Sequence, residues 1–272
     1  MIFDLIVPSY NERATLQKLL DIVTQIPEFK TIYIIDGGSN DGTDELINTY
    51  NDKRIDFISS SAYSLADTIS PIAKARNVVL KKSQTGDVFF FVDLGCLYEI
   101  QSFQNIIKAM IEKGVDFAYV KTMAFITTPY SKRYSSVMIK TEKYYTNQHL
   151  PSSRFLAVKA DTFMEIGGYN ELAFAGEDTD FSLKLVKSYN GKMVPGQVLW
   201  IVPKTRREAM RKHFKYGFGD GSYKNNITTI LFCLLFPFIP TKKEDFSFFF
   251  LEKIILRFCY GIGGGVALIR KK

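Results

Sequence analysis

The sequence predicts an α/β fold, in which a mostly parallel sheet carries helices on both faces and a helical C-terminal region follows. Short apolar runs alternate with longer amphipathic segments over the first 95 residues. This alternation is typical of parallel strands joined by crossover helices. Hydrophobic residues make up 46% and charged residues 23% of the 272 residues, so the chain can build a buried core. The last quarter differs from the rest, because it combines apolar segments with all of the excess positive charge.

The predicted elements follow one another regularly up to residue 92. We expect strands at residues 2–7, 31–35, 55–58 and 88–92, and helices at residues 15–24, 43–50 and 72–81. Beyond residue 113 the pattern is mixed, with strands expected at 115–122, 153–159 and 192–202 and helices at 131–145, 178–188 and 205–216. We divide the chain into a first domain at residues 1–220 and an apolar, basic helical region at residues 221–272.

Polar and small residues follow three of the predicted strands. The first strand runs into Pro-Ser-Tyr-Asn-Glu at residues 8–12, and the second into Asp-Gly-Gly-Ser-Asn-Asp-Gly-Thr at residues 36–43. The fourth runs into Asp-Leu-Gly-Cys at residues 93–96. Ligands of such sheets bind beyond the carboxyl ends of the strands, so these three segments are expected to meet at one crevice.

The segment that begins at Asp36 suits a nucleotide. A carboxylate followed by glycines lets the backbone come close to a flat ligand, and Asp36 can accept hydrogen bonds from the edge of a uracil or guanine ring. Asp41 and Thr43 fit a helix cap equally well, with Gly42 in the turn. The segment lacks the Gly-x-x-x-x-Gly-Lys-Ser/Thr spacing of a phosphate-binding loop.

Two further carboxylates suit chemistry at such a site. Asp93 is placed to hold a divalent cation, because Mg²⁺ favours one or two carboxylates together with phosphate oxygens and water. A capped strand end is the alternative for this residue. Asp178, in Gly-Glu-Asp-Thr-Asp at residues 176–180, begins a predicted helix and suits a general base, which contributes about 10²–10⁴-fold to a rate. Ordinary capping of the helix N-terminus explains Asp178 as well.

Taken together, the order of these motifs resembles the family 2 glycosyltransferases with the GT-A fold. The resemblance covers residues 1–220 and also rests on Ala-Arg-Asn at 75–77, Gly-Gly-Tyr-Asn-Glu at 167–171 and Gly-Glu-Asp at 176–178. It implies an inverting transfer from a nucleotide-activated sugar by direct displacement, with Asp178 as the catalytic base. It also implies that Asp93 is the first carboxylate of the family's Asp-x-Asp metal motif. The implied nucleotide-sugar site consists of Pro8, Ser9, Tyr10, Glu12, Asp36, Gly38, Ser39, Arg76, Asp93 and Glu177.

The metal motif departs from the family's pattern. Gly95 stands where a second carboxylate is usual, so a Mg²⁺ or Mn²⁺ cofactor would depend on Asp93, the diphosphate and water. His213 is a candidate for a further metal ligand. The alternative is that this lone histidine in a basic helix is a surface or packing residue.

A second departure lies at residues 212–217, where the chain reads Lys-His-Phe-Lys-Tyr-Gly. This is similar to the family's Gln-x-x-Arg-Tyr-Gly variant, found in enzymes of exopolysaccharide and lipid-linked glycan assembly. Lys215 then replaces the arginine and Tyr216 supplies the aromatic ring, although lysine lacks the bidentate fork that arginine offers to a diphosphate. A basic helix without substrate contact is the alternative.

The C-terminal region is basic as well as apolar. Residues 204–272 carry 14 Lys and Arg against 5 Asp and Glu, whereas the first 203 residues carry 21 against 23. The apolar segments 227–240 and 246–269 are too short or too charged to cross a bilayer comfortably, which takes about 20 apolar residues. We expect two interfacial or re-entrant helices on an anionic membrane surface. Their expected anchors are Lys242, Lys243, Arg270, Lys271 and Lys272. A short hairpin through the bilayer, packing onto the first domain and a homodimer interface are the alternatives.

The remaining sequence features bear on location. The N-terminus has no basic leader before its short apolar run, so no signal peptide is expected. Cys96, Cys233 and Cys259 are too few and too scattered for a disulfide framework or a zinc cluster, which favours a reducing compartment. No nucleic-acid-reading module accompanies the basic region. We therefore expect a peripheral or monotopic protein at the cytoplasmic face of the cell membrane.

The predicted activity is transfer of a sugar from a UDP- or GDP-sugar to a hydroxyl or phosphate of a lipid-linked glycan or polysaccharide. Arg154, Phe174 and residues 118–128 are candidates, by position, for selecting the sugar. One alternative is a regulatory homologue that binds a nucleotide-sugar without transferring it. Another is a sugar nucleotidyltransferase, which would need a Gly-rich phosphate loop with a nearby cation, and residues 8–10 do not supply one.

Overall fold

The computed structural model describes residues 1–60, 70–81, 86–142, 150–173, 176–222, 227–235 and 250–270. The chain forms two compact units. Unit 1 comprises residues 1–124, 149–172 and 176–201, and unit 2 comprises residues 125–148, 173–175 and 202–272. The division into domains at residue 220 remains a prediction, and Phe174 lies outside the described residues.

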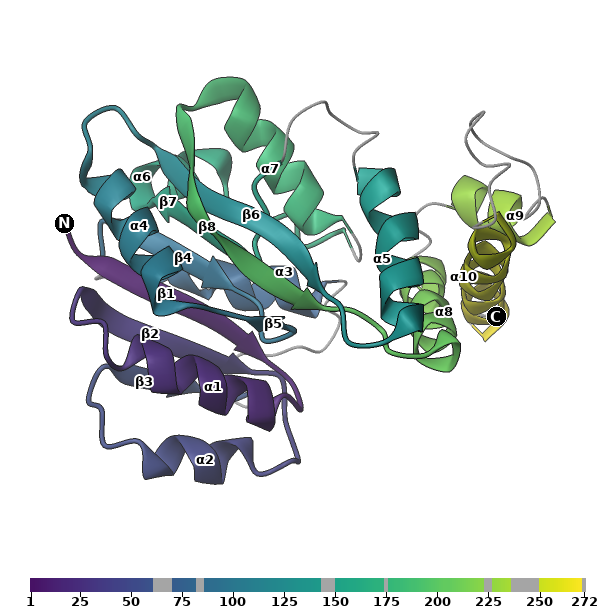
Figure 1. The fold of residues 1–272 in the computed structure, drawn as a ribbon, viewed down its shortest axis with the longest axis horizontal. Coiled ribbons are helices and arrows are strands. Elements are labelled where there is room, and N and C mark those ends of the chain that lie inside the picture. The colour runs from purple at the N-terminus through teal and green to yellow at the C-terminus, as the bar shows by residue number, and fades with distance from the viewer. Residues whose placement is uncertain are drawn as a thin grey trace. The chain divides into compact units, whose positions relative to one another are not determined.

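Unit 1 is built on a sheet of eight strands within the described residues, in the order β3-β2-β1-β4-β7-β6-β8-β5 (Figure 1). The strands are β1 (Phe3–Ser9), β2 (Phe29–Asp36), β3 (Ile55–Ile58), β4 (Val88–Val92), β5 (Cys96–Leu97), β6 (Phe117–Phe125), β7 (Phe155–Lys159) and β8 (Gly191–Ile201). Strands β1 to β4 pair in parallel, with β1 between β2 and β4. Strand β7 pairs antiparallel with β4 and β6, and β5 pairs antiparallel with β8. The predicted α/β fold is confirmed, and its second half contributes antiparallel pairs.

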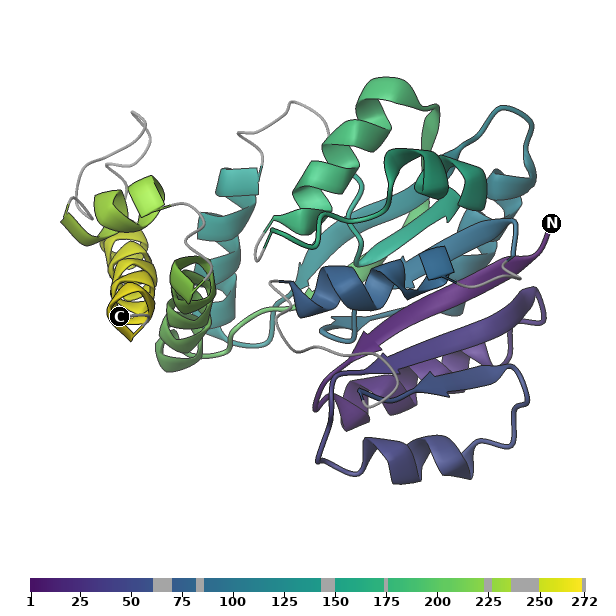
Figure 2. The same cartoon turned by 180° about the vertical axis from the view of Figure 1, so that it is seen from behind.

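Helices cover both faces of this sheet. They are α1 (Arg13–Val23), α2 (Thr43–Thr49), α3 (Pro71–Arg76), the 3-10 helix η1 (Asn77–Lys81), α4 (Ile100–Ile111), α6 (Ala160–Ile166) and α7 (Glu177–Ser188). Figure 1 shows α1 and α4 on the near side of the sheet, and Figure 2 shows α3 on the opposite side. Strand β4 is apolar on both faces because successive side chains point to opposite sides. Val88, Phe90 and Val92 pack with α1, α2 and α4, whereas Phe89 and Phe91 pack with α3, α6 and α7.

The observed elements extend those predicted from the sequence. Strand β5 and helices α4 and α6 have no counterpart in the prediction. The helix expected at residues 72–81 is the short α3 followed directly by η1. Each of the three predicted polar segments does follow a parallel strand, namely β1, β2 and β4.

Unit 2 contains the helices α5 (Pro129–Glu142), α8 (Arg206–Ser222), α9 (Ile227–Leu235) and α10 (Phe250–Arg270). Helix α10 packs along α8 and against α9. Glu252 of α10 is 2% exposed and accepts hydrogen bonds from the Tyr130 hydroxyl of α5 (2.5 Å) and from Arg206 of α8 (3.0 Å). A buried carboxylate with two such donors ties the three helices together.

The helices expected in the C-terminal region occur as α9 and α10. Among the residues that the structure describes, no helix combines the length and the apolar character needed to span a membrane. Lys242, Lys243, Lys271 and Lys272 lie outside the described residues, and Arg270 ends α10. Association of this region with a membrane remains a prediction.

Candidate active site

The carboxylate of Asp36 shapes the loop that follows β2. Its Oδ2 accepts hydrogen bonds from the amides of Gly38 and Ser39, both at 2.8 Å, and its Oδ1 accepts one from the Ser39 hydroxyl at 2.5 Å. Gly38 has φ = +93°, a backbone conformation that a side chain strongly disfavours. Asp36 is therefore buried in its own turn, which holds the glycine-containing backbone in one conformation.

The loops after β1 and β2 are joined to each other. The Asn11 amide donates to Ser39 Oγ (2.8 Å), and Asn11 Oδ1 accepts from the Asn40 amide (2.9 Å). The Gly37 amide donates to the Ser9 carbonyl (2.8 Å), beyond the parallel pair of Ser9 with Asp36. Seven of the predicted nucleotide-site residues lie at the ends of β1 and β2 or in these loops: Pro8, Ser9, Tyr10, Glu12, Asp36, Gly38 and Ser39. Among them, Tyr10 is 64% exposed, and its ring offers a face on which a base can stack.

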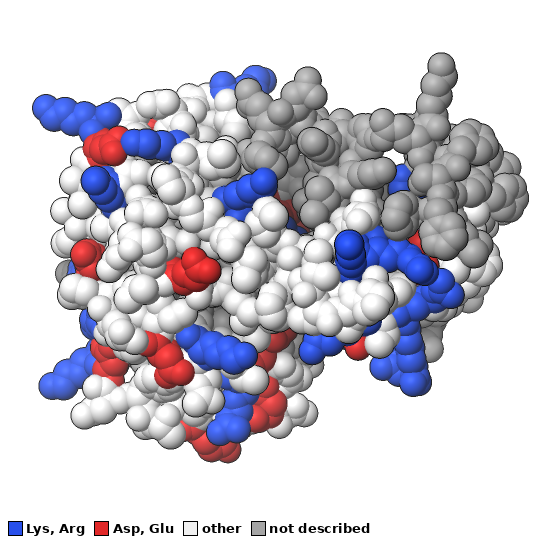
Figure 3. All heavy atoms as spheres, in the orientation of Figure 1, with Lys and Arg blue, Asp and Glu red and all other residues white. Residues whose placement is uncertain are grey.

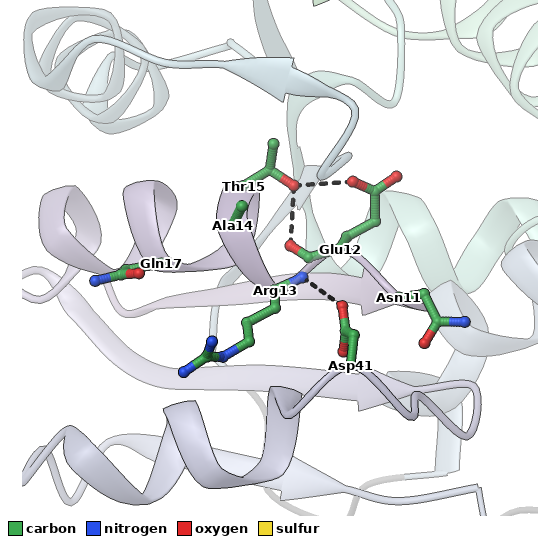
Figure 4. A pocket seen from close by; sticks show the side chains of 7 residues that line it. All are labelled: Asn11, Glu12, Arg13, Ala14, Thr15, Gln17 and Asp41. Carbon is green, nitrogen blue, oxygen red and sulfur yellow. Dashed lines mark hydrogen bonds between the residues drawn. The ribbon is translucent and has the colours of Figure 1, made fainter. Parts of the chain in front are cut away.

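A pocket of about 330 Å³ lies beside these loops, at the start of α1 (Figure 4). Its walls are formed by Asn11, Glu12, Arg13, Ala14, Thr15, Gln17 and Asp41. The Arg13 amide donates to Asp41 (2.9 Å), and the Thr15 hydroxyl donates to the Glu12 carboxylate (3.0 Å). Neither Asp93 nor Asp178 lines this pocket, so it is not the place where those carboxylates act.

Arg76 joins two of the other predicted site residues. Its guanidinium donates to Asp93 Oδ1 at 2.6 Å and to Glu177 Oε1 at 3.0 Å, and it lies 4.9 Å from the centre of the Tyr169 ring. Burial opposes the charged guanidinium, but the carboxylates of Asp93 and Glu177 outweigh it and raise the pKa of Arg76 above its ordinary value. Burial also raises the pKa of the Glu177 carboxyl, which Arg76 only partly offsets. One buried cation thus connects the end of β4 to the start of α7.

Asp178 lies in the first turn of α7, next to Glu177. Gly176 precedes the helix with φ = +85°. The Asp178 Oδ1 accepts a hydrogen bond from the Thr179 amide at 2.8 Å, which suits a carboxylate at a helix N-terminus. The Asp178 side chain is half-buried, whereas Glu177 is buried against Arg76. Of these two neighbouring carboxylates, Asp178 is the more accessible to an acceptor.

The loop after β4 is held by Tyr98, a residue that no motif in the sequence indicated. The Tyr98 hydroxyl accepts from the Asp93 amide (2.9 Å) and lies within hydrogen-bonding distance of the carbonyls of Asp93 (2.6 Å) and Arg154 (2.8 Å). The Arg154 guanidinium stacks 4.6 Å from the Trp200 ring, and Trp200 pairs with Cys96 on β5. Arg154, a candidate for sugar selection, therefore lies in a segment tied to the Asp93 loop.

The donor set fits a weakly held divalent cation. A side chain at Gly95 would meet no atom within 4 Å, so the position of the family's second carboxylate opens onto free space. No group of three His, Cys, Asp or Glu side chains with metal-binding geometry occurs within the described ranges. Asp93, whose Oδ1 is paired with Arg76 at 2.6 Å, would hold a Mg²⁺ or Mn²⁺ ion only together with diphosphate oxygens and water.

The predicted residues His213, Lys215 and Tyr216 lie on α8, in unit 2. His213 Nε2 is 3.4 Å from the Tyr134 hydroxyl, and burial together with the nearby Lys212 lowers the pKa of His213 to about 4. The imidazole is therefore neutral at pH 7, the form in which histidine binds metals. Lys215 and Tyr216 are exposed. The roles of these three residues in metal and diphosphate binding remain predictions.

Comparisons with known proteins define the class of this fold. A mannosyltransferase from Pyrobaculum calidifontis, solved in complex with GDP-Man and Mn²⁺, superimposes with a TM-score of 0.56 at 14% identity, over 99% of this chain and 75% of that one. Glucosyl-3-phosphoglycerate synthase from Mycobacterium tuberculosis, solved with Mn²⁺, UDP and phosphoglyceric acid, gives a TM-score of 0.54 at 15% identity, over 78% and 75% of the two chains. The fold is the GT-A-like α/β fold of such glycosyltransferases.

The sequence comparisons identify the family. A model of glycosyl transferase family 2 matches residues 4–166, and the chain belongs to this family. Glycosyltransferase AglE of Haloferax volcanii is 24% identical over 229 residues, which is 79% of this chain and 71% of the relative. An uncharacterized glycosyltransferase of Haemophilus influenzae is 23% identical over 198 residues, which is 67% of this chain and 61% of that protein.

Proposed function

We propose that this glycosyltransferase moves a sugar from a UDP- or GDP-sugar to an acceptor hydroxyl or phosphate with inversion at the anomeric carbon. One observation carries the proposal. Arg76 forms ion pairs with both Asp93 and Glu177, and Glu177 is the neighbour of Asp178. The GDP-Man and UDP in the two superimposed structures support the class of donor. The family membership supports the transfer itself.

The proposed roles follow the order of the strand ends. The loops after β1 and β2 receive the nucleoside, with the exposed Tyr10 ring as its stacking surface. Asp93 faces the diphosphate end of the donor. The acceptor oxygen attacks the anomeric carbon as the bond to the diphosphate breaks, and the Asp178 carboxylate takes the acceptor's proton. A single displacement of this kind inverts the configuration at that carbon.

A divalent cation at Asp93 would stabilise the negative charge of the departing nucleoside diphosphate. We expect Gly95→Asp to lower the Mn²⁺ concentration that gives half-maximal transfer by about tenfold, since the number and charge of ligands set the affinity of such sites. The new side chain has room, because nothing lies within 4 Å of its Cβ position. The matched control is Gly95→Asn, which adds the same volume without the charge. If the two variants require the same Mn²⁺ concentration, the proposal that a cation binds at this position is contradicted.

The acceptor is proposed to be a lipid-linked glycan at the cytoplasmic face of the cell membrane. Lys and Arg side chains gather over α8 in unit 2 (Figure 3), including the exposed Arg207, Arg211 and Lys215. Met210 and Phe214 on the same helix are each 36% exposed. A helix with exposed cations beside apolar side chains suits an anionic lipid surface. Polysaccharide acceptors and a homodimer formed through unit 2 are the alternatives.

One set of mixtures tests donor, acceptor and location together. The protein is incubated with a panel of UDP- and GDP-sugars, with Mn²⁺ or with EDTA, and with a polyprenyl phosphate in vesicles that contain or lack phosphatidylglycerol. We expect one donor to raise the melting temperature and to support transfer, and the protein to float with the anionic vesicles.

Other outcomes of these mixtures support the rival functions. Binding of a donor without transfer or hydrolysis would indicate a regulatory homologue. Formation of a nucleotide-sugar from a nucleoside triphosphate and a sugar phosphate would indicate a nucleotidyltransferase. A protein that does not float with vesicles and has the mass of a dimer by light scattering would support the homodimer alternative.

A further inference from the structure

We propose that Arg76 and Asn77 are positioning residues, which align Asp93 and the first turn of α7 for transfer without touching the nucleotide. This inference rests on the proposed role of Asp178 as the base. The resemblance to the family implies a different role for Arg76, namely contact with the nucleotide. The contacts of the two side chains decide between these roles.

Arg76 is enclosed by the protein. Its side chain is 1% exposed, and its two terminal nitrogens contact Asp93 at 2.6 Å and Glu177 at 3.0 Å. The Tyr169 ring covers the guanidinium at 4.9 Å. A planar guanidinium with two carboxylates on its fork is fixed in orientation as well as in position. Arg76 therefore reaches a ligand only through the carboxylates that it holds.

Asn77 performs the same task for the neighbouring loop. Its Oδ1 accepts from the Tyr169 amide at 2.8 Å, and its Nδ2 donates to the Tyr169 carbonyl (2.8 Å) and to the Glu171 carboxylate (2.9 Å). Gly168 has φ = +71°, and a Cβ there would lie 2.5 Å from Asn77 Oδ1. The chain passes close to Asn77 because residue 168 has no side chain. The described part of this loop, residues 167–173, is thereby tied to the end of α3.

Helix α3 ends at Arg76, and Asn77 follows it directly at the start of η1, so both residues share one support. Ser70 caps the helix by accepting from the Ala73 amide, and Pro71 occupies its first turn. The Ser70 amide also donates to the Glu171 carbonyl at 3.2 Å, so both ends of α3 hold the same loop. Two consecutive side chains thus fix the carboxylate after β4, residues 169–171 and the residue before Asp178. A displacement of about 1 Å between reacting groups costs about 10²-fold in rate, so alignment of this kind affects turnover directly.

The test separates alignment from nucleotide contact. The variants are Arg76→Lys, which keeps the charge but loses the fork, and Asn77→Ala. We expect each variant to lower kcat by about 10- to 100-fold. The Kd for UDP or GDP should stay within about threefold of the wild-type value. This Kd is measured in EDTA, so that a cation at Asp93 does not contribute. Hydrogen exchange of the amides in residues 167–173 is expected to accelerate in Asn77→Ala.

Arg54→Lys is the matched control for a lost arginine fork. Arg54 donates to Asp52 and to the carbonyls of Thr24 and Ile26, in a part of unit 1 outside the Arg76 cluster. We expect this change to lower stability without lowering kcat. A Kd for the nucleotide that rises in parallel with the loss of kcat in Arg76→Lys would overturn the proposal in favour of direct contact. If the wild-type protein transfers no sugar, the proposed function is refuted. If hydrogen exchange in residues 167–173 is unchanged in Asn77→Ala, the positioning role is refuted, whatever the outcome of the transfer assay.

Discussion

Replacing Asp178 by Asn is expected to reduce kcat for sugar transfer by about 10²–10⁴-fold, because an amide cannot take the proton of the acceptor. Asn has the size of Asp and keeps an oxygen that can accept from the Thr179 amide, now at 2.8 Å, so the first turn of α7 should remain intact. Affinity for the nucleoside diphosphate is expected to change little, since Asp178 acts on the acceptor side. The measurement is kcat with the donor found in the panel, together with the Kd of its nucleotide.

Asp180→Asn is the control for this change. Asp180 lies in the same turn and pairs with Lys184 at 2.8 Å, with its side chain 42% exposed. Loss of an exposed pair of this kind has little energetic effect, so transfer should continue at the wild-type rate. Full activity in Asp178→Asn would exclude Asp178 as the base.

The parallel half of the fold was predictable because the alternation of strands and helices is visible in the sequence. Apolar runs such as residues 88–92 alternate with amphipathic helices, and β1 to β4 formed where such runs occur. The direction of β7 was not predictable. Phe155–Lys159 is almost continuously apolar, as is β4. The sequence of a strand that is buried on both faces does not distinguish parallel from antiparallel pairing. Its antiparallel pairing with β4 depends on tertiary packing.

The site was predictable as a set of residues but not as a set of contacts. Local sequence indicated Asp36 and Asp93 at strand ends and Asp178 at the start of a helix, and the resemblance to the family implied their roles. Local sequence could not show that Asp36 would bond to its own loop or that Arg76 would be enclosed. The contact of Arg76 with Glu177 spans 101 positions, and that of Asn77 with Tyr169 spans 92. Spacing along the chain carries no information about such distant pairs, although Ala-Arg-Asn and Gly-Gly-Tyr already stood out as motifs.

The packing of α10 on α8 depends on glycines at the contact. A Cβ at Gly217 of α8 would lie 1.8 Å from the Tyr260 carbonyl oxygen, and a Cβ at Gly263 of α10 would lie 2.1 Å from that of Phe214. Both neighbours are backbone atoms, which cannot rotate away as a side chain can. The two helix backbones therefore approach each other more closely than any side chain at these positions allows. Gly265 of α10 differs, because its Cβ would meet only Leu234 Cδ2 at 4.0 Å.

Gly217→Ala and Gly265→Ala are expected to shift stability in opposite directions. The same methyl group should destabilise the protein by about 1–3 kcal/mol at Gly217, where it overpacks the helix contact. At Gly265 it should stabilise the protein by about 0.5–1 kcal/mol, because alanine favours a helix interior over glycine. Thermal unfolding followed by circular dichroism measures both changes. For a chain of this size or slightly smaller, the melting temperature shifts by about 2–4 °C for each kcal/mol of stability. Equal melting temperatures for the two variants would contradict the close contact of α8 with α10, and would leave the apolar helices of unit 2 available for a membrane instead.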